Sequence, residues 1–249
     1  MTRQIFKSKK NYRTENHYIL WPELTRGTLI RRYKRFLADV ELEDGTKVTA
    51  HCANSGSMKA CNEPGCPVFL SFHDHPGRKL KYTWEMIKMP ESLVGVNTNW
   101  PNKLVSQAIV SDAIEELQGY PFLHTEVKVS EHSRLDLMLA GRDDQTCYIE
   151  VKNCTLVEKG VASFPDAVTD RGRKHLVELQ KLKGMKTRCV IFFLVQRMDT
   201  CIFKPADEID PEYGRELRNA HENGVEILVY DVFMDETKIG VRNKLSYQL

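Results

Sequence analysis

Asp136, Glu150 and Lys152 lie in two segments that alternate between apolar and polar residues. The alternation predicts two strands, over 134–140 and 146–154, that pair as a hairpin. If the hairpin is centred on residue 143, Asp136 lies directly opposite Glu150. Carboxylates that face each other across strands repel, so a sequence selected only for folding would rather pair an acid with a base.

A pair of facing carboxylates beside a lysine has the chemistry of a divalent-metal site that acts on phosphate. Carboxylate oxygens bind Mg²⁺ or Mn²⁺, and the bound ion polarises a phosphoryl oxygen and lowers the pKa of a water. The pattern predicts Asp136 and Glu150 as metal ligands, the carbonyl of Val151 as a further ligand, and Lys152 as the group that orients the water. The alternative is an ordinary hairpin whose charges lie in solvent, because the pattern is short and a shift of one residue would reverse its faces.

Basic side chains are concentrated in two segments of a chain whose net charge is only +2. Residues 1–35 contain ten basic and two acidic side chains, and residues 169–188 contain seven basic and two acidic ones. Such segments indicate a surface for nucleic acid phosphates, or else ordinary solvated faces. The candidate nucleic-acid contacts are Arg31, Arg32, Tyr33, Lys34, Arg35, Arg171 and Lys174.

Two different patterns divide the chain near residue 100. Before it, short strand-like runs separated by turn signals predict a small β-barrel, with strands at 29–42, 47–52, 67–72, 80–89 and 93–97. After it, helices are expected at 102–118, 170–183 and 211–223, and strands at 122–129, 134–140, 146–154, 188–196 and 225–233. This order predicts an α/β domain with a mixed sheet. The expected division is an extension at 1–25, a barrel at 26–100 and the α/β domain at 101–249, with residues 1–22 only loosely attached.

The composition excludes several classes of protein. With 41% hydrophobic and 28% charged residues, the chain is neither disordered nor a coiled coil. No apolar run approaches the roughly 18 residues of a membrane span. Three of the seven cysteines, Cys147, Cys154 and Cys189, lie in apolar runs as reduced core residues do. Together with the lack of a secretory segment, this favours a cytoplasmic protein.

Several segments together resemble the sugar fermentation stimulation protein A family. They are Arg31–Val40, His51–Met58, Thr83–Glu85, Val96–Thr98, Tyr148–Lys152 and Phe164–Gly172, and the similarity covers about 26–249. The resemblance implies a bacterial-type DNA-binding protein. It also implies an OB-fold-like barrel followed by a PD-(D/E)xK nuclease-like, restriction-endonuclease-like domain.

Matched to the nuclease motif, Leu135-Asp136 stands at the "PD" and Glu150-Val-Lys152 is the "ExK". The literal Pro165-Asp166 follows the ExK and is therefore in the wrong order. Members of this superfamily often add an acid from the first helix, for which Glu115 and Glu116 are both candidates.

Two functions follow from the resemblance. The first is a Mg²⁺- or Mn²⁺-dependent phosphodiesterase that binds DNA without sequence specificity. The second is a non-catalytic regulator of sugar (maltose) metabolism that uses the nuclease fold only to bind DNA. The set Asp136, Glu150 and Lys152 favours the enzyme, since a binder gains nothing from two acids facing a polyanion. His175 has two interpretations, a core-edge histidine or a catalytic one, and the loop 54–57 is either structural or a backbone site for phosphate.

Overall fold

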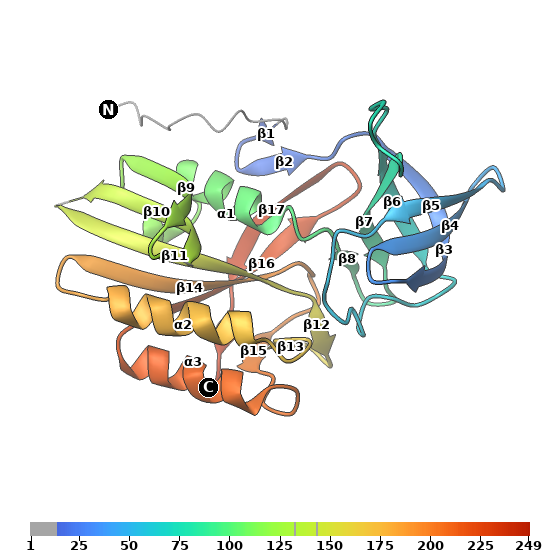
Figure 1. Cartoon of the computed structure of the whole chain (residues 1–249). Helices are drawn as coiled ribbons and strands as arrows, with labels where there is room; N and C mark the ends of the chain where they lie inside the picture. The colour runs from blue at the N-terminus through green and yellow to red at the C-terminus, as the bar shows by residue number, and fades with distance from the viewer. Residues whose placement is uncertain (1–13, 132, 143) are drawn as a thin grey trace.

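The computed structural model describes residues 14–131, 133–142 and 144–249. Figure 1 shows a β-barrel beside a larger α/β unit. The barrel strands are β3 (Leu24–Tyr33), β4 (Leu37–Leu42), β5 (Lys47–His51), β6 (Pro67–Phe72), β7 (Tyr82–Lys88) and β8 (Leu93–Gly95). Their order is β5-β4-β3-β6-β7-β8, and pairing of β5 with β7 closes the barrel as predicted.

The predicted strand at 29–42 is in fact two strands. Lys34 and Arg35 both have positive φ angles, of 47° and 62°, which turn the chain between β3 and β4. The hydrophobic pattern of the two strands is continuous because the turn is short, so periodicity alone did not reveal it. Side chains that alternate along the strands fill the barrel, among them Leu29, Val40 and the fully buried Trp84.

The α/β unit is built on one eight-stranded sheet of mixed direction. Its main strands are β9 (Phe122–Lys128), β10 (Arg134–Arg142), β11 (Gln145–Cys154), β14 (Thr187–Val195), β16 (Glu226–Met234) and β17 (Lys238–Lys244). β11, β14 and β16 are parallel, whereas β9, β10 and β17 run antiparallel to their neighbours. This confirms the predicted mixed sheet.

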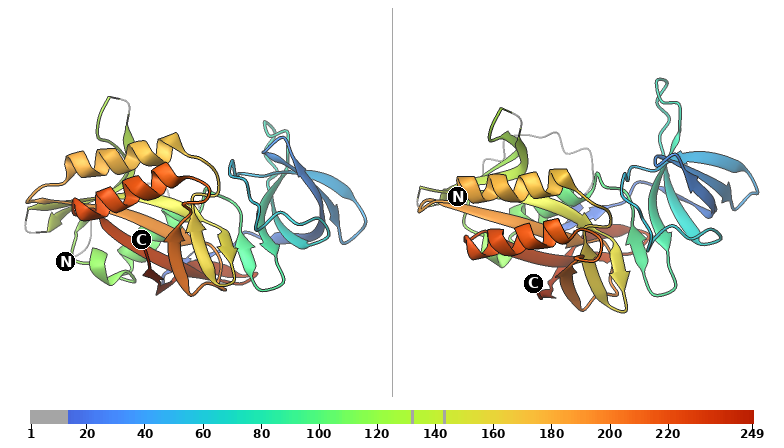
Figure 2. Two further views of the ribbon diagram at one scale, coloured as in Figure 1. Left: turned by 90° about the horizontal axis from the view of Figure 1, so that it is seen from below. Right: turned by 60° about the horizontal axis from the view of Figure 1, so that its bottom comes forward.

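Helices cover both faces of this sheet. α1 (Pro101–Val110) lies on one face, and α2 (Asp170–Leu182) and α3 (Pro211–Glu222) lie side by side on the other (Figures 1 and 2). A small second sheet contains β12 (Leu156–Glu158), β13 (Val161–Phe164), β15 (Ile202–Pro205) and β18 (Ser246–Tyr247). None of the helices in the described residues is long and apolar enough to cross a membrane.

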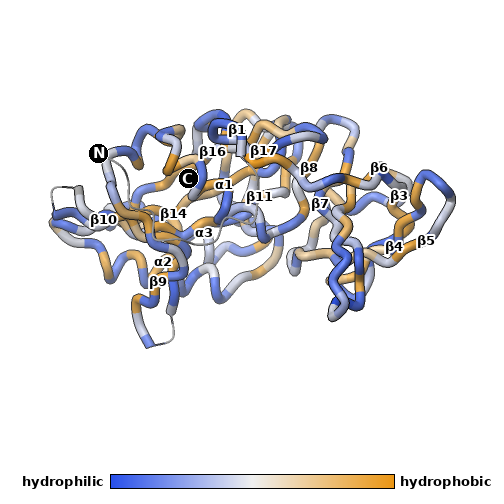
Figure 3. Tube along the Cα trace, turned by 90° about the horizontal axis from the view of Figure 1, so that it is seen from above, coloured by the Kyte–Doolittle hydropathy of each residue, from blue (hydrophilic) through white to orange (hydrophobic). Residues whose placement is uncertain are grey.

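Each face of the sheet has its own hydrophobic core. The core under α1 includes Leu104 and Ile149 and reaches Met86 of the barrel, so the two units share buried contacts. The core under α2 and α3 includes Leu176 and Phe193. In Figure 3 the hydrophobic colour accordingly concentrates along the strands, while most connecting loops are hydrophilic.

Residues 14–20 are part of the sheet, which corrects the expectation of a loose extension for that stretch. β1 (Thr14–Glu15) pairs with β2 (Tyr18–Leu20), and β2 pairs with β17. Ile19 is fully buried and Trp21 nearly so. Three apolar residues are too few to show a period, so the segment was missed. The predicted domain limits at residues 25 and 100 stay predictions, and residues 1–13 lie outside the described part.

Replacing Ile19 with alanine should destabilise the whole protein by about 2–4 kcal/mol, because a buried side chain leaves a cavity between β2 and the core under α1. The free energy of unfolding from urea titration measures this. Glu23→Ala, at an exposed position close by, is the control and should change it by less than about 0.5 kcal/mol. An equal, small effect in both variants would mean that β2 does not contribute to the fold.

Candidate active site

β10 and β11 form the predicted hairpin in the predicted register. Leu137 lies opposite Ile149, and the pairing continues toward the turn, where both strands extend into the expected loop 141–145. The centre of that loop, residue 143, lies outside the described residues. The ladder ends at Leu137 and Ile149, so Asp136 and Glu150 lie just beyond the last paired residues.

Asp136 lies where β10 changes its packing. Strict alternation along 134–140 predicts that Leu135 and Leu137 share one face, but Leu135 belongs to the core under α2 and α3 and Leu137 to the core under α1. Asn102 Nδ2, in the first turn of α1, donates to Asp136 Oδ1 at 2.8 Å. The N–H of Val151 donates to Asp136 Oδ2 at 2.8 Å. These bonds hold the carboxylate between β11 and the start of α1.

Glu150 and Lys152 project from β11 toward α2, where His175 meets them. Lys152 Nζ donates to Glu150 Oε1 at 2.7 Å, and Nδ1 of His175 contacts the same oxygen. His175 Nδ1 also lies 3.1 Å from Lys152 Nζ. His175 is buried, at 8% exposure, as expected for a core-edge histidine, and it also touches Glu150. A catalytic role for it stays a prediction.

The environments of the two acids move their pKa values apart. Burial raises the pKa of Asp136 to about 6, and the charge of nearby Glu150 acts in the same direction. Burial also acts to raise the pKa of Glu150, but the hydrogen bond from His175 and the charge of Lys152 outweigh it and hold that pKa below its usual range. Asp136 is therefore the group that takes up a proton near neutral pH.

The donor set fits a hard divalent cation. Glu150 Oε2 is buried and has no hydrogen-bond partner within the described residues, so one carboxylate oxygen remains available as a ligand. No cluster of three or more His, Cys, Asp or Glu side chains placed to hold a metal occurs in that part of the chain. A metal here would use Asp136, Glu150, the carbonyl of Val151 and waters, a combination that Mg²⁺ accepts more readily than metals requiring a full protein cage.

The candidate acids Glu115 and Glu116 lie elsewhere. The helix expected at 102–118 ends at Val110, and the two acids form a separate 3₁₀ turn, η1 (Glu115–Leu117). Glu116 accepts a hydrogen bond from Tyr230 and forms an ion pair with Lys244. Instead of an acid, α1 contributes the amide of Asn102, and no pattern in the sequence predicts this contact with Asp136.

The predicted nucleic-acid residues of the barrel divide into two groups. Arg31 bonds Asp39 at 2.9 Å and lies over the ring of Tyr33, whose hydroxyl also bonds Asp39. Arg32 donates to backbone carbonyls of the loop 54–57, so it supports the fold. Lys34 and Arg35 are exposed at the β3–β4 turn and remain accessible to a ligand. On α2, Arg171 and Lys174 are likewise exposed.

The loop 54–57 holds an anion that the protein itself supplies. Ser57 Oγ and the N–H of Met58 both donate to Asp166 Oδ2, at 3.2 and 3.1 Å. Asp166 comes just before α2, so this contact joins the barrel to the helix that carries His175. The literal Pro165-Asp166 therefore has a structural contact and lies outside the carboxylate pair, as its order along the chain indicated.

Comparison with known proteins gives two family matches that cover most of the chain. The model described as the SfsA N-terminal OB domain matches residues 30–96, and that of the sugar fermentation stimulation protein RE domain matches 99–238. The chain belongs to the sugar fermentation stimulation protein family. Both parts of the predicted fold class, the OB-fold-like barrel and the restriction-endonuclease-like α/β domain, are confirmed.

Members of this family are similar to the chain over nearly their whole length. The sugar fermentation stimulation protein homolog of Geotalea uraniireducens is 55% identical, over 89% of this chain and 96% of its own. That of Geotalea daltonii is 54% identical, over 91% and 97%. A solved structure of Pyrococcus furiosus SfsA in complex with Ca²⁺ superimposes with a TM-score of 0.84 at 26% identity, covering 92% of this chain and 98% of that one. Asp136, Glu150 and Lys152 all lie in the part matched by the family's RE domain.

We expect metal affinity at this site to fall as the pH drops below about 6, because a metal must displace the proton that Asp136 binds there. Above that pH the carboxylate is ionised and affinity levels off. Below it, affinity should fall about tenfold per pH unit for one displaced proton. Calorimetric titration with Mn²⁺ at several pH values measures this.

Asn102→Ala provides the control for that titration. The bond from Asn102 lowers the pKa of Asp136, so its loss should move the midpoint to higher pH. An affinity that stays constant from about pH 5 to pH 7 would contradict the assignment of the proton to Asp136.

Proposed function

We propose that the protein binds DNA without sequence specificity and hydrolyses phosphodiester bonds with a divalent metal, Mg²⁺ or Mn²⁺. The observation that carries the proposal is the pair of the half-buried Asp136 and the buried Glu150, beside the half-buried Lys152, where the β10–β11 pairing ends. A fold gains nothing from burying two acids of unequal pKa, but a metal site needs them. The Ca²⁺ in the Pyrococcus furiosus relative supports the choice of a hard cation.

The residues of the chain would act in distinct ways. When bound, the metal would polarise a phosphoryl oxygen and lower the pKa of a water. Asn102 and the N–H of Val151 keep the carboxylate of Asp136 in a single orientation. Lys152 lies next to Glu150 and would orient the attacking water and offset negative charge on the phosphate. His175 keeps Glu150 ionised and in position.

The exposed cations provide the proposed DNA contacts. Lys34 and Arg35 at the barrel turn and Arg171 and Lys174 on α2 are free to contact phosphates, whereas Arg31 and Arg32 already have protein partners.

A cytoplasmic location stays a prediction from the composition.

A second function, DNA binding without cleavage, is favoured by one observation. Glu150 Oε1 is already engaged by both Lys152 and His175, so the site is neutralised without a metal. In that case the nuclease fold would serve a regulator of sugar metabolism and would only bind DNA.

The two functions are distinguished by incubating the purified protein with single-stranded and double-stranded DNA, in Mg²⁺, in Mn²⁺ and in EDTA. Metal-dependent cleavage supports the proposed enzyme. Binding that weakens steeply with salt, with no cleavage of either DNA in either metal, would leave the binding protein.

A further inference from the structure

A cleft of about 1130 Å³ lies between the barrel and the first turn of α1. Three of the segments that carry the family resemblance meet there, although the proposed function uses none of them. They contribute His51, Thr83, Glu85 and Asn97 to its lining. The loop between β6 and β7 adds His73 and Arg78.

Glu85 organises the cleft, and buried donors satisfy both of its carboxylate oxygens. It is 2% exposed, and Ser71 Oγ donates to its Oε1 at 2.6 Å. Asn97 Nδ2 and Trp100 Nε1 donate to its Oε2 at 2.8 and 2.7 Å. Both oxygens are therefore occupied by donors of the protein and do not point at a ligand in the cleft.

The same network orients His73 toward the cleft. Ser71 gives its only proton to Glu85, so its contact of 2.8 Å with His73 Nε2 requires that nitrogen to donate. The other ring nitrogen, Nδ1, then faces away from Ser71 and has no hydrogen-bond partner within the described residues.

The arginine of the cleft forms no ion pair within the described residues, although Glu23 and Glu85 also line the cleft. This arginine, Arg78, donates to the hydroxyl of Thr83. His51 and His73 both have lowered pKa values, first because of burial and then because of the charge of Arg78. An anion bound among these three groups would raise both pKa values and favour the protonated imidazoles, which can donate to it.

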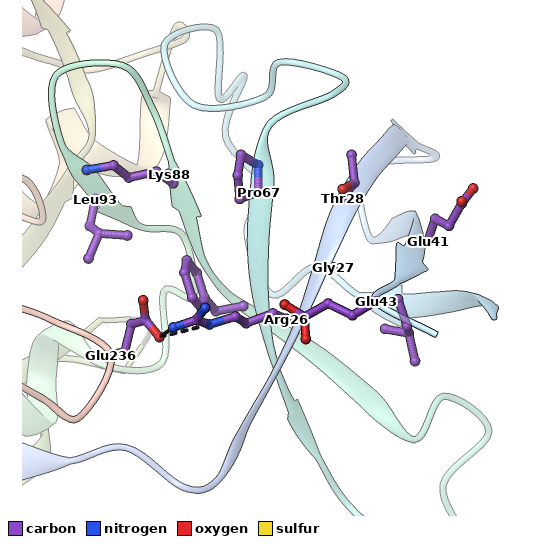
Figure 4. Close-up of a pocket in the computed structure, with 11 residues that line it drawn as sticks. Arg26, Gly27, Thr28, Glu41, Glu43, Pro67, Lys88, Leu93 and Glu236 are labelled. Atoms are coloured by element: carbon purple, nitrogen blue, oxygen red, sulfur yellow. Dashed lines mark hydrogen bonds and ion pairs between the residues drawn. The ribbon is translucent and has the colours of Figure 1, made fainter. Parts of the chain in front are cut away.

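The other large groove on the barrel has a different balance of charges. It lies over β3 and β6, and its one arginine, Arg26, is already bound to Glu236 (Figure 4). Glu41 and Glu43 add negative charge to its lining, and Lys88 offsets only one of them. That groove therefore disfavours phosphate, whereas the cleft at Arg78 favours it.

We propose that the cleft binds a phosphate group of the DNA strand, through Arg78, His51 and His73. The inference rests on the proposed function for the identity of the strand. Adjacent residues of α1 join the two sites, because Lys103 lines the cleft while Asn102 bonds Asp136. The cleft would bind one backbone phosphate, and a different phosphate of the same strand would enter the metal site.

The test uses the full chain in EDTA, so that the metal site does not contribute. Two of the three tryptophans, Trp21 and Trp100, line the cleft, and their fluorescence should change saturably on titration with an oligothymidylate of about 12 nucleotides. Inorganic phosphate, as the second ligand, should give the same change at much higher concentration. Arg78→Ala should weaken both by about tenfold or more.

Matched variants make the result specific. Lys79→Ala removes the same charge from the next, exposed residue of the loop, which does not line the cleft, and should weaken binding less than about twofold. Arg78→Lys should recover part of the affinity, which an unfolded variant would not do. Asp136→Ala should bind as the unaltered chain does, so loss of cleavage and loss of cleft binding are distinguishable.

Equal effects of Arg78→Ala and Lys79→Ala, or no saturable change with either ligand, would overturn the site. Binding of phosphate without binding of the oligonucleotide would overturn its assignment to a DNA strand.

Discussion

Replacing Asp136 with alanine should reduce the rate of metal-dependent DNA cleavage by on the order of a thousandfold or more. The side chain provides one of the two carboxylates, and it is oriented by Asn102 and by the N–H of Val151. Among the described residues no third acid lies at the site to replace it, and Glu115 and Glu116 lie in a separate turn. Single-turnover cleavage in Mn²⁺ measures the rate, and calorimetric titration with Ca²⁺ should show that metal binding is lost with it.

Glu208→Ala is the matched control for Asp136→Ala. It removes an exposed acid from the same domain and should leave both cleavage and Ca²⁺ binding within about twofold of the unaltered chain. Binding of DNA in EDTA should persist in both variants, because cations provide it. Cleavage that survives Asp136→Ala would show that the reaction takes place elsewhere on the molecule.

Replacing Lys152 with alanine should reduce cleavage by at least about a hundredfold while Ca²⁺ binding persists. The ammonium group touches Glu150 but is not a metal ligand, so its loss should affect the reaction and leave the ligands in place. Glu150 keeps its contact with His175, and we expect stability to fall by only about 1–3 kcal/mol. The comparison of cleavage rate, Ca²⁺ affinity and thermal unfolding separates these effects.

Lys181→Ala, which removes an exposed lysine from the far end of α2, controls for the lost charge and should cleave at the normal rate. If Lys152→Ala lost Ca²⁺ binding together with cleavage, the lysine would be needed to assemble the site, and a direct role in the reaction would be wrong.

Long periodic elements of this fold were predictable from the sequence, and short ones were not. The helix expected at 170–183 is Asp170–Leu182, because its apolar stripe repeats over three turns and Thr169 caps its start. The three residues of β2 show no period, and neither do the short strands of the second sheet. Such strands form because partners far along the chain, such as β17, offer unpaired edges.

Of the candidate site, the residues on the strands were predictable and the residues on the helices were not. Asp136, Glu150 and Lys152 were recognisable because strand alternation places them near one another and like charges stood out. Asn102 and His175 were missed as partners, since each depends on how a helix packs on the sheet. Glu116 was misplaced because the helix ends at Val110, eight residues earlier than its apolar spacing indicated.

The position of β2 has a consequence for how the chain folds as it is synthesised. β2 precedes the whole barrel in the chain, yet it pairs with β17, close to the C-terminus. The barrel is therefore an insertion within the α/β domain and has all its strands within 24–95, so it can close while the ribosome is still making the rest. The large sheet must wait, with β2 paired only to β1, until nearly the last residue has emerged. For the same reason, a fragment that starts at residue 101 would expose the edge of β17 and tend to aggregate.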